Sequence, residues 1–227
     1  MTNKYIYFIA NWKMFGNLRT LNSLNPVISF VKKFKKNKIK IIYCPPATLL
    51  NSLSNKLKSS SIQIGAQNCH ESDNYGAYTG QINSSMLKAV GAKYVILGHS
   101  ENRQMGENDN VINQKIKSSI KSGLKVIFCI GETLTQKRKN ITKKILSRQI
   151  SIGLKNIKNK KDIIIAYEPV WSIGSGLIPK NSEINEIVKF IKKKAKGINV
   201  LYGGSVNSKN INVLKKINNV NGFLIGG

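Results

Sequence analysis

Eight short apolar segments recur along this chain, and longer amphipathic segments separate them. The short segments are rich in β-branched and aromatic residues, as strands are, whereas the apolar residues between them recur at helical three- and four-residue steps. Alternation of this kind predicts parallel strands joined by helices, and eight strands favour a closed (β/α)8 barrel over an open sheet. We expect the strands at 5–10, 40–43, 63–66, 94–97, 125–129, 163–167, 199–202 and 222–225.

The length and composition suit one α/β domain. The 227 residues, of which 41% are hydrophobic, can bury one large core, so we expect a single domain over residues 1–227. The longest apolar runs, such as 6–10, are too short to cross a bilayer, and residues 1–4 lack the pattern of a signal peptide. The sequence therefore predicts a cytoplasmic protein without a membrane partner.

The cysteines Cys44, Cys69 and Cys129 are widely spaced and lie in or beside apolar runs. They form no C-x-x-C pair, and only His70 and His99 could complete a metal site with them. We therefore expect reduced thiols and no metal site.

The formal net charge of +27 raises the question of an acidic partner. Most of the 37 basic residues are lysines, whereas reading of base edges and forked phosphate contacts favour arginine. Lysine runs such as 32–36 and 192–194 are typical of solvated helix faces. These features predict no specific nucleic-acid partner, leave nonspecific adhesion to polyanions at low salt open, and provide a positive field that would attract a small phosphorylated substrate.

Glu168 follows the strand expected at 163–167, and a loop flanked by glycines follows Glu168. Pro169 ends the strand, and Gly174 and Gly176 give backbone freedom beyond a small apolar tip. This layout predicts a catalytic base beneath a closing lid, although a solvated strand end is the simpler interpretation of an isolated glutamate. The lid is expected to comprise Pro169, Val170, Trp171, Ser172, Ile173, Gly174, Ser175 and Gly176.

Polar residues also follow other expected strands, and a parallel barrel would bring them to one mouth. Asn11 and Lys13 follow the first strand, and His99 precedes a helix start that would keep its imidazole neutral and able to donate a hydrogen bond. Alone, His99 could be a core histidine and Lys13 a lysine reaching into solvent. The turn 203–205 offers backbone amides for a phosphate. For the helices, we expect Asn181 or Ser182 to cap one N-terminus and Ser208 another.

Several motifs that occur in order along the chain resemble the triosephosphate isomerase family. They are 11–14 (NWKM), 98–103 (GHSENR), 129–133 (CIGET), 167–171 (YEPVW), 202–206 (YGGSV) and 224–227 (LIGG). Single motifs of this length arise by chance, but an ordered set does not. The segments 66–68 and 76–80 are also similar to the family's interdigitating dimer loop, which is expected to include Tyr75, Gly76, Ala77, Tyr78, Thr79 and Gly80.

The resemblance implies a TIM barrel that interconverts dihydroxyacetone phosphate and D-glyceraldehyde 3-phosphate, as a homodimer and without metal or organic cofactor. It implies that Glu168 moves the proton and that His99 polarises the carbonyl group. It further implies that Lys13 and Asn11 stabilise the substrate oxygens, with Glu101 paired to Lys13 in support. Amides that bind the phosphate are expected from Gly174, Ser205, Gly226 and Gly227.

The chain departs from the family in a few places. Asn102 replaces a basic residue, and the connection between Lys196 and Val200 is short, for which we expect a compact turn. The sequence ends at Gly227, where the family continues into a last helix. We therefore expect a barrel without that helix, weaker phosphate binding and an uncovered flank that could recruit a second dimer. The alternative function is a catalytically impaired barrel that acts as a scaffold or a nonspecific polyanion binder.

Overall fold

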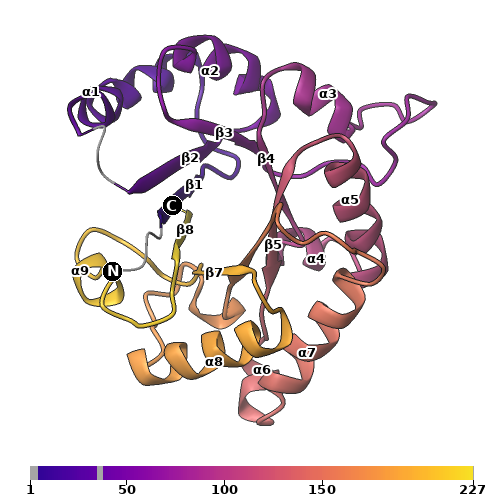
Figure 1. Ribbon diagram of the computed structural model, residues 1–227, viewed down its shortest axis with the longest axis vertical. Coiled ribbons are helices and arrows are strands. Elements are labelled where there is room, and N and C mark those ends of the chain that lie inside the picture. Colours follow the sequence, from indigo (N-terminus) through magenta and orange to yellow (C-terminus); the bar gives the residue numbers. More distant parts are fainter. Residues whose placement is uncertain (1–4, 35–37, 227) are drawn as a thin grey trace.

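The computed structural model describes residues 5–34 and 38–226. Eight parallel strands close into a barrel in chain order, and Figure 1 shows the helices as a ring around them. The expected fold class is confirmed. The strands are β1 (Ile6–Asn11), β2 (Ile39–Cys44), β3 (Gln63–Ala66), β4 (Tyr94–Leu97), β5 (Lys125–Ile130), β6 (Ile163–Tyr167), β7 (Asn199–Tyr202) and β8 (Gly222–Gly226). The ranges expected for β3, β4, β6 and β7 coincide with these bounds, and the others differ at their ends.

The connections contain α-helices and shorter 3-10 helices. The 3-10 helices are η1 (Leu18–Leu24), η2 (Ala47–Leu49) and η3 (Val170–Ser172). The α-helices are α1 (Asn25–Lys33), α2 (Leu50–Leu57), α3 (Ser84–Ala89), α4 (Ser100–Gln104), α5 (Asp109–Lys121), α6 (Leu134–Arg138), α7 (Thr142–Gly153), α8 (Asn181–Lys194) and α9 (Ile211–Leu214). The short connection before β7 is a compact turn, as expected: the Ile198 amide donates to the Ala195 carbonyl, and Gly197 has a φ of +80°.

The predicted helix caps were wrong. Helix α8 already includes Asn181 in its first turn, and Lys180 precedes it without a side-chain capping bond. Ser208 lies in a turn before α9, where Asn207 Oδ1 accepts the amides of Lys209 (2.9 Å) and Asn210 (3.1 Å). The longer Asn side chain reaches amides two and three residues ahead, so Asn207 organises this turn in place of Ser208.

Alternation along each strand divides the core into two layers. In β6, Ile164 and Ala166 point into the barrel, whereas Ile163, Ile165 and Tyr167 pack against the surrounding helices. The inner layer consists of Tyr7, Ile9, Ile42, Cys44, Tyr94, Ile96, Ile127, Cys129, Ile164, Ala166, Leu201 and Leu224. Side chains alternate between the inside and the outside of the barrel with a period of two. The same alternation continues beyond the ends of the strands and determines which residues point into the barrel mouth.

The cysteines Cys44, Cys69 and Cys129 are all buried and free. Burial raises the pKa of each thiol above its ordinary value. Within the described ranges, no helix combines the length and the apolarity that crossing a bilayer requires.

Candidate active site

A cavity of about 320 Å³ opens at the carboxyl ends of the strands. Its position follows from the strand register, since Asn11, Glu168 and Gly203 continue the inward-pointing series of β1, β6 and β7. Of the residues expected at the site, the cavity is lined by Asn11, Lys13, His99, Glu168, Gly174, Ser205 and Gly226. Gly227 lies outside the described residues.

Glu168 is almost fully buried, with 2% of its surface exposed. Its backbone N–H donates to the Ile130 carbonyl (2.8 Å), which ties the end of β6 to β5. Burial raises the pKa of the carboxyl above its ordinary value of 4.5, and the neighbouring His99 and Lys13 offset only part of that effect. A buried carboxylate of raised pKa holds a proton more tightly than a solvated one, as a catalytic base must.

Two glycines make room for Glu168. A β-carbon on Gly131 would lie 1.7 Å from the Glu168 carbonyl oxygen, and one on Gly203 would lie 2.8 Å from Cγ of Glu168. Any larger residue at these positions would displace the glutamate. Gly131 and Gly203 therefore fix where the carboxylate sits.

His99 is the N-cap residue of α4. Its Nδ1 accepts the backbone N–H of Glu101 (3.3 Å), so in the neutral imidazole the proton lies on Nε2. Nε2 is 3.6 Å from Oε1 of Glu168. The donor nitrogen of the imidazole therefore faces the cavity beside the carboxylate.

Lys13 has a φ of +52°, a conformation that costs a non-glycine residue roughly 1–3 kcal/mol. Neighbouring side chains hold it there: Asn11 Oδ1 accepts the Lys13 N–H (3.0 Å), and Gln67 Nε2 donates to the Lys13 carbonyl (2.8 Å). The Lys13 ammonium pairs with Glu101 Oε1 at 2.7 Å. This ion pair is the one expected for Glu101.

The lid segment contains the short helix η3 and two glycines with positive φ, Gly174 (+68°) and Gly176 (+74°). Glycine adopts such angles without the strain that a side chain would cause, which accounts for glycine at both positions. Inside the segment, Ser175 Oγ donates to the Trp171 carbonyl (3.0 Å) and accepts the Leu177 amide (3.1 Å).

Glu132 is a residue to which the sequence reasoning assigned no role. It is 1% exposed, and its Oε1 accepts hydrogen bonds from the Trp171 indole N–H (2.9 Å) and the Tyr167 hydroxyl (3.3 Å). Burial raises the pKa of its carboxyl, and these two bonds lower it in part. Lys137 Nζ lies 3.8 Å from the centre of the Trp171 ring. The signal available in the sequence was an acidic residue directly after an apolar strand.

Ser172 holds an amide that was expected to bind phosphate. The Ser205 N–H donates to Ser172 Oγ (3.3 Å), and the same oxygen donates to the Leu177 carbonyl and lies 3.3 Å from the Tyr202 hydroxyl. The lid and the turn after β7 are thus joined through one hydroxyl group.

The expected dimer loop projects from the barrel between β3 and α3, at the right of Figure 1. Tyr75 is 78% exposed, and Tyr78 stacks on His70 with the ring centres 4.4 Å apart. This loop lies apart from Glu168 and does not line the cavity.

A larger cavity of about 550 Å³ lies on the outer side of the barrel, beside α4 and α7. Its two arginines are already engaged, because Arg103 (2.6 Å) and Arg148 (3.3 Å) both pair with Asp109. It contains neither Glu168 nor His99. The smaller cavity at the mouth is therefore the candidate active site.

The fold defines the class of protein, a (β/α)8 barrel, and the neighbouring Glu168 and His99 at its mouth are suited to general acid–base chemistry. The sequence profile of the triosephosphate isomerase family matches residues 6–227. The chain belongs to that family.

Individual relatives agree with this assignment. The triosephosphate isomerase of Thermodesulfovibrio yellowstonii is 42% identical over 237 aligned residues, which cover 100% of this chain and 94% of that protein. The enzyme of Chlorobium luteolum is 38% identical, with 96% and 91% covered. The crystal structure of triosephosphate isomerase from Bartonella henselae superposes with a TM-score of 0.88 at 36% identity and covers 98% of this chain and 92% of that one.

Proposed function

We propose that this chain interconverts dihydroxyacetone phosphate and D-glyceraldehyde 3-phosphate, the isomerase step of glycolysis and gluconeogenesis, with Glu168 as the proton carrier. The family assignment makes the chain a triose-phosphate isomerase. The observation that supports the role of Glu168 is its position: a buried carboxylate at the barrel mouth, 3.6 Å from the imidazole Nε2 of His99.

In the proposed reaction, the Glu168 carboxylate removes a proton from C1 of dihydroxyacetone phosphate, and the C2 carbonyl becomes part of an enediolate. His99 donates its Nε2 proton to the oxygen on C2 and takes up the proton of the oxygen on C1. Glu168 then returns its proton to C2. Both side chains end as they began, so the isomerisation consumes nothing. The Glu–His scheme for this enzyme is an established pattern in mechanistic enzymology.

Lys13 and Asn11 stabilise the charge that develops on the substrate oxygens. A fixed ammonium lowers the barrier when it acts on charge that appears only during the reaction. Two hydrogen bonds to the Lys13 backbone supply that fixed position: Asn11 Oδ1 accepts the Lys13 N–H, and Gln67 Nε2 donates to the Lys13 carbonyl. Glu101 supports this arrangement twice, through its ion pair with Lys13 and through the amide that it donates to His99.

The phosphate group of the substrate is expected to bind the amides of Gly174, Ser205, Gly226 and Gly227. Three of these residues, Gly174, Ser205 and Gly226, line the cavity and come from the lid, the turn after β7 and the end of β8. Closure of the lid over the bound phosphate would exclude water and protect the enediolate.

A coupled isomerase assay on the wild type and on Glu168→Gln tests the assignment. General-base catalysis contributes roughly 10²- to 10⁴-fold, so kcat should fall by that factor. Glu186→Gln is the matched control, because Glu186 is exposed and pairs with Lys143 far from the cavity. If both variants retained the wild-type rate, Glu168 would not be the base. A wild type without turnover would instead favour the scaffold.

We also propose that the chain acts in the cytoplasm as a homodimer assembled through the loop 75–80. Three large apolar side chains are exposed to solvent: Tyr75 (78%), Tyr78 (50%) and Met14 (95%). Burial of these side chains at an interface would remove the unfavourable contact of their apolar surface with water. Light scattering should give the mass of a dimer for the wild type. The double variant Tyr75→Asp/Tyr78→Asp should give the mass of a monomer. A wild-type tetramer would support a second contact through the flank of β1 and β8.

A further inference from the structure

Lysines gather at the end of the barrel where the strands begin. All the helix-to-strand connections of a parallel barrel lie at this end. In the described part of these connections Asp162 is the sole acidic residue. An exposed lysine precedes or begins each strand from β2 to β8: Lys38, Lys58, Lys93, Lys125, Lys161, Lys196 and Lys216. We name these seven residues the basal lysines.

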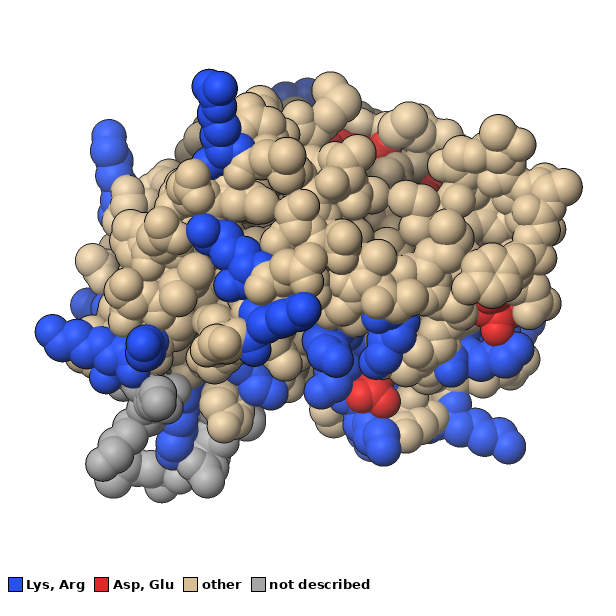
Figure 2. Space-filling model, turned by 90° about the horizontal axis from the view of Figure 1, so that it is seen from above, with Lys and Arg blue, Asp and Glu red and all other residues tan. Residues whose placement is uncertain are grey.

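The opposite end of the barrel has a mixed charge. The strand-to-helix connections there, with their short helices, carry Lys13, Arg19, Arg103, Lys137, Arg138, Lys139, Lys180 and Lys209 together with Glu71, Asp73, Glu101, Glu107, Glu132 and Glu168. The two ends therefore differ mainly in their acidic residues: the strand-to-helix end carries these six, whereas the described helix-to-strand connections carry Asp162 alone. In Figure 2, most blue side chains lie along the lower side of the molecule, and the upper side is mostly tan with red atoms in its recess.

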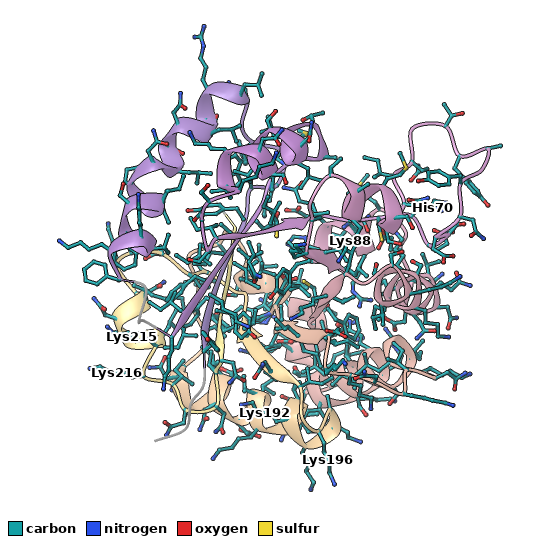
Figure 3. All side chains as sticks on the ribbon, turned by 45° about the horizontal axis from the view of Figure 1, so that its top comes forward. His70, Lys88, Lys192, Lys196, Lys215 and Lys216 are labelled. Atoms are coloured by element: carbon teal, nitrogen blue, oxygen red, sulfur yellow. The ribbon has the colours of Figure 1, made fainter. Side chains whose placement is uncertain are left out.

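The basal lysines have no acidic partners within the described ranges. Ion pairs are formed by Lys13, Lys115, Lys121, Lys137 and Lys143, and none of these is a basal lysine. In Figure 3, Lys196 and Lys216 lie on the ends of α8 and α9, with their side chains on the outside of the fold. Like charges left unpaired repel one another, and a polyanion relieves that repulsion when it binds.

Two exposed aromatic rings lie at the same end of the barrel as the basal lysines. Tyr5, just before β1, is 48% exposed, and Phe34, at the end of α1, is 44% exposed. Lys40 Nζ lies 4.6 Å from the Tyr5 ring centre, and Lys33 Nζ lies 5.7 Å from that of Phe34. An aromatic ring beside an ammonium group matches a single-stranded nucleic acid better than it matches a lipid. The unpaired base can stack on the ring, and the lysine can bind the neighbouring phosphate of the nucleic-acid backbone.

We propose that this end of the barrel binds single-stranded nucleic acid without sequence preference. The basal lysines bind the phosphates, and Tyr5 and Phe34 stack on bases. No arginine lies in the described part of these connections, so base edges are not read. The bound strand leaves the catalytic mouth open, because the two surfaces lie at opposite ends of the barrel.

Fluorescence anisotropy with labelled oligouridylate tests the proposal at about 150 mM salt, where unfocused surface charge is largely screened. The test variant is Lys125→Glu/Lys161→Glu/Lys196→Glu, three basal lysines that begin or precede the neighbouring strands β5, β6 and β7. The matched control is Lys117→Glu/Lys144→Glu/Lys189→Glu, which changes the net charge equally on the outer faces of α5, α7 and α8.

The basal variant should raise Kd by at least about tenfold and reduce the slope of log K against log salt by about 0.7 for each phosphate that is no longer neutralised. The control variant should stay within about threefold of the wild type, since binding depends on the face and not on net charge. Tyr5→Ala should raise Kd by at least about fivefold, whereas Tyr5→Phe retains the stacking face and the affinity. Isomerase turnover should be unchanged in both charge variants.

Specific outcomes overturn the proposal. One is a wild type that binds no oligouridylate at this salt concentration. Another is an equal loss of affinity in the two charge variants, which would mean that net charge alone attracts the strand. A third is binding to phosphatidylserine vesicles that oligouridylate does not compete with, which would assign the face to a membrane.

Discussion

Gly203 faces the side chain of Glu168 so closely that a β-carbon there would lie 2.8 Å from Cγ and 3.3 Å from Oε1 of the glutamate. The two residues follow neighbouring strands, β7 and β6, and the absence of a side chain at one leaves space for the carboxylate of the other. The geometry of the base is therefore set partly by a residue without functional groups.

Gly203→Ala should lower kcat on the order of 100-fold, because displacing a reacting group by about 1 Å has this effect. Gly203 does not have a positive φ, so alanine should not strain the backbone. The far-ultraviolet circular dichroism should stay that of the wild type. An unchanged kcat would mean that Glu168 does not need this position.

The acid limb of the pH–rate profile should report the raised pKa of Glu168. Burial raises this pKa above 4.5, so Glu168 becomes protonated at a higher pH than an exposed glutamate does. We expect kcat/KM of the free enzyme to decline on the acid side with an apparent pKa above 4.5. A profile that stays flat to below 4.5 would contradict a buried base.

The same pKa shift predicts that Glu168→Gln stabilises the fold. Below 4.5 the carboxyl is protonated in both folded and unfolded chains, and the folded state holds that proton more tightly. As pH rises through the folded pKa, the buried charge costs free energy and the wild type loses this stability. Urea unfolding should show the variant as more stable at neutral pH, with a difference that shrinks toward pH 4.5. Equal stability at all pH values would refute the shift.

Trp171→Phe should lower the free energy of unfolding by roughly 1–3 kcal/mol, since it removes the indole N–H that Glu132 accepts and leaves a buried carboxylate with fewer partners. Trp12→Phe is the control: Trp12 packs edge-on against Tyr43, and its indole makes no hydrogen bond with any described residue. Denaturant titration of both variants measures the difference. If Trp171→Phe lowered the free energy of unfolding no more than Trp12→Phe does, the hydrogen bond between Trp171 and Glu132 would not contribute to stability.

Gln67→Ala should lower kcat without a matching rise in KM. It removes hydrogen bonds to the carbonyls of Lys13 (2.8 Å) and Cys44 (2.9 Å), and so loosens a lysine held at a strained φ. Gln63→Ala loses a bond from the Tyr94 hydroxyl (3.1 Å) at the other end of β3 and should affect stability alone. Steady-state kinetics of the pair separates these effects. The same kcat in both variants would argue against a positioning role for Gln67.

The strands and the mouth of the barrel were predictable because short β-branched runs mark buried parallel strands. The uncharged run 163–166 identified β6, and the barrel topology then placed Glu168, which follows that strand, at the mouth. The resemblance to a family then assigned chemistry to Asn11, Lys13 and His99.

Other parts of the site could not be predicted because they depend on contacts between residues that lie far apart in the sequence. Glu132 meets Trp171 only because β5 and β6 are neighbours and the lid folds back over them. Gln67 reaches Lys13 across an interval of 54 residues. The caps of α8 and α9 were missed for a local reason, since several adjacent residues could cap and the turn geometry selects among them.

In the proposed phosphate site, the hydrogen bond from the Ser205 amide to Ser172 Oγ makes substrate binding an exchange of hydrogen-bond acceptors. An amide has one hydrogen to give, so a phosphate oxygen and the serine hydroxyl compete for it. A bound phosphate would therefore replace Ser172 as the partner of this amide. Because Ser172 belongs to the proposed lid, phosphate binding at the turn after β7 would be coupled directly to movement of the lid.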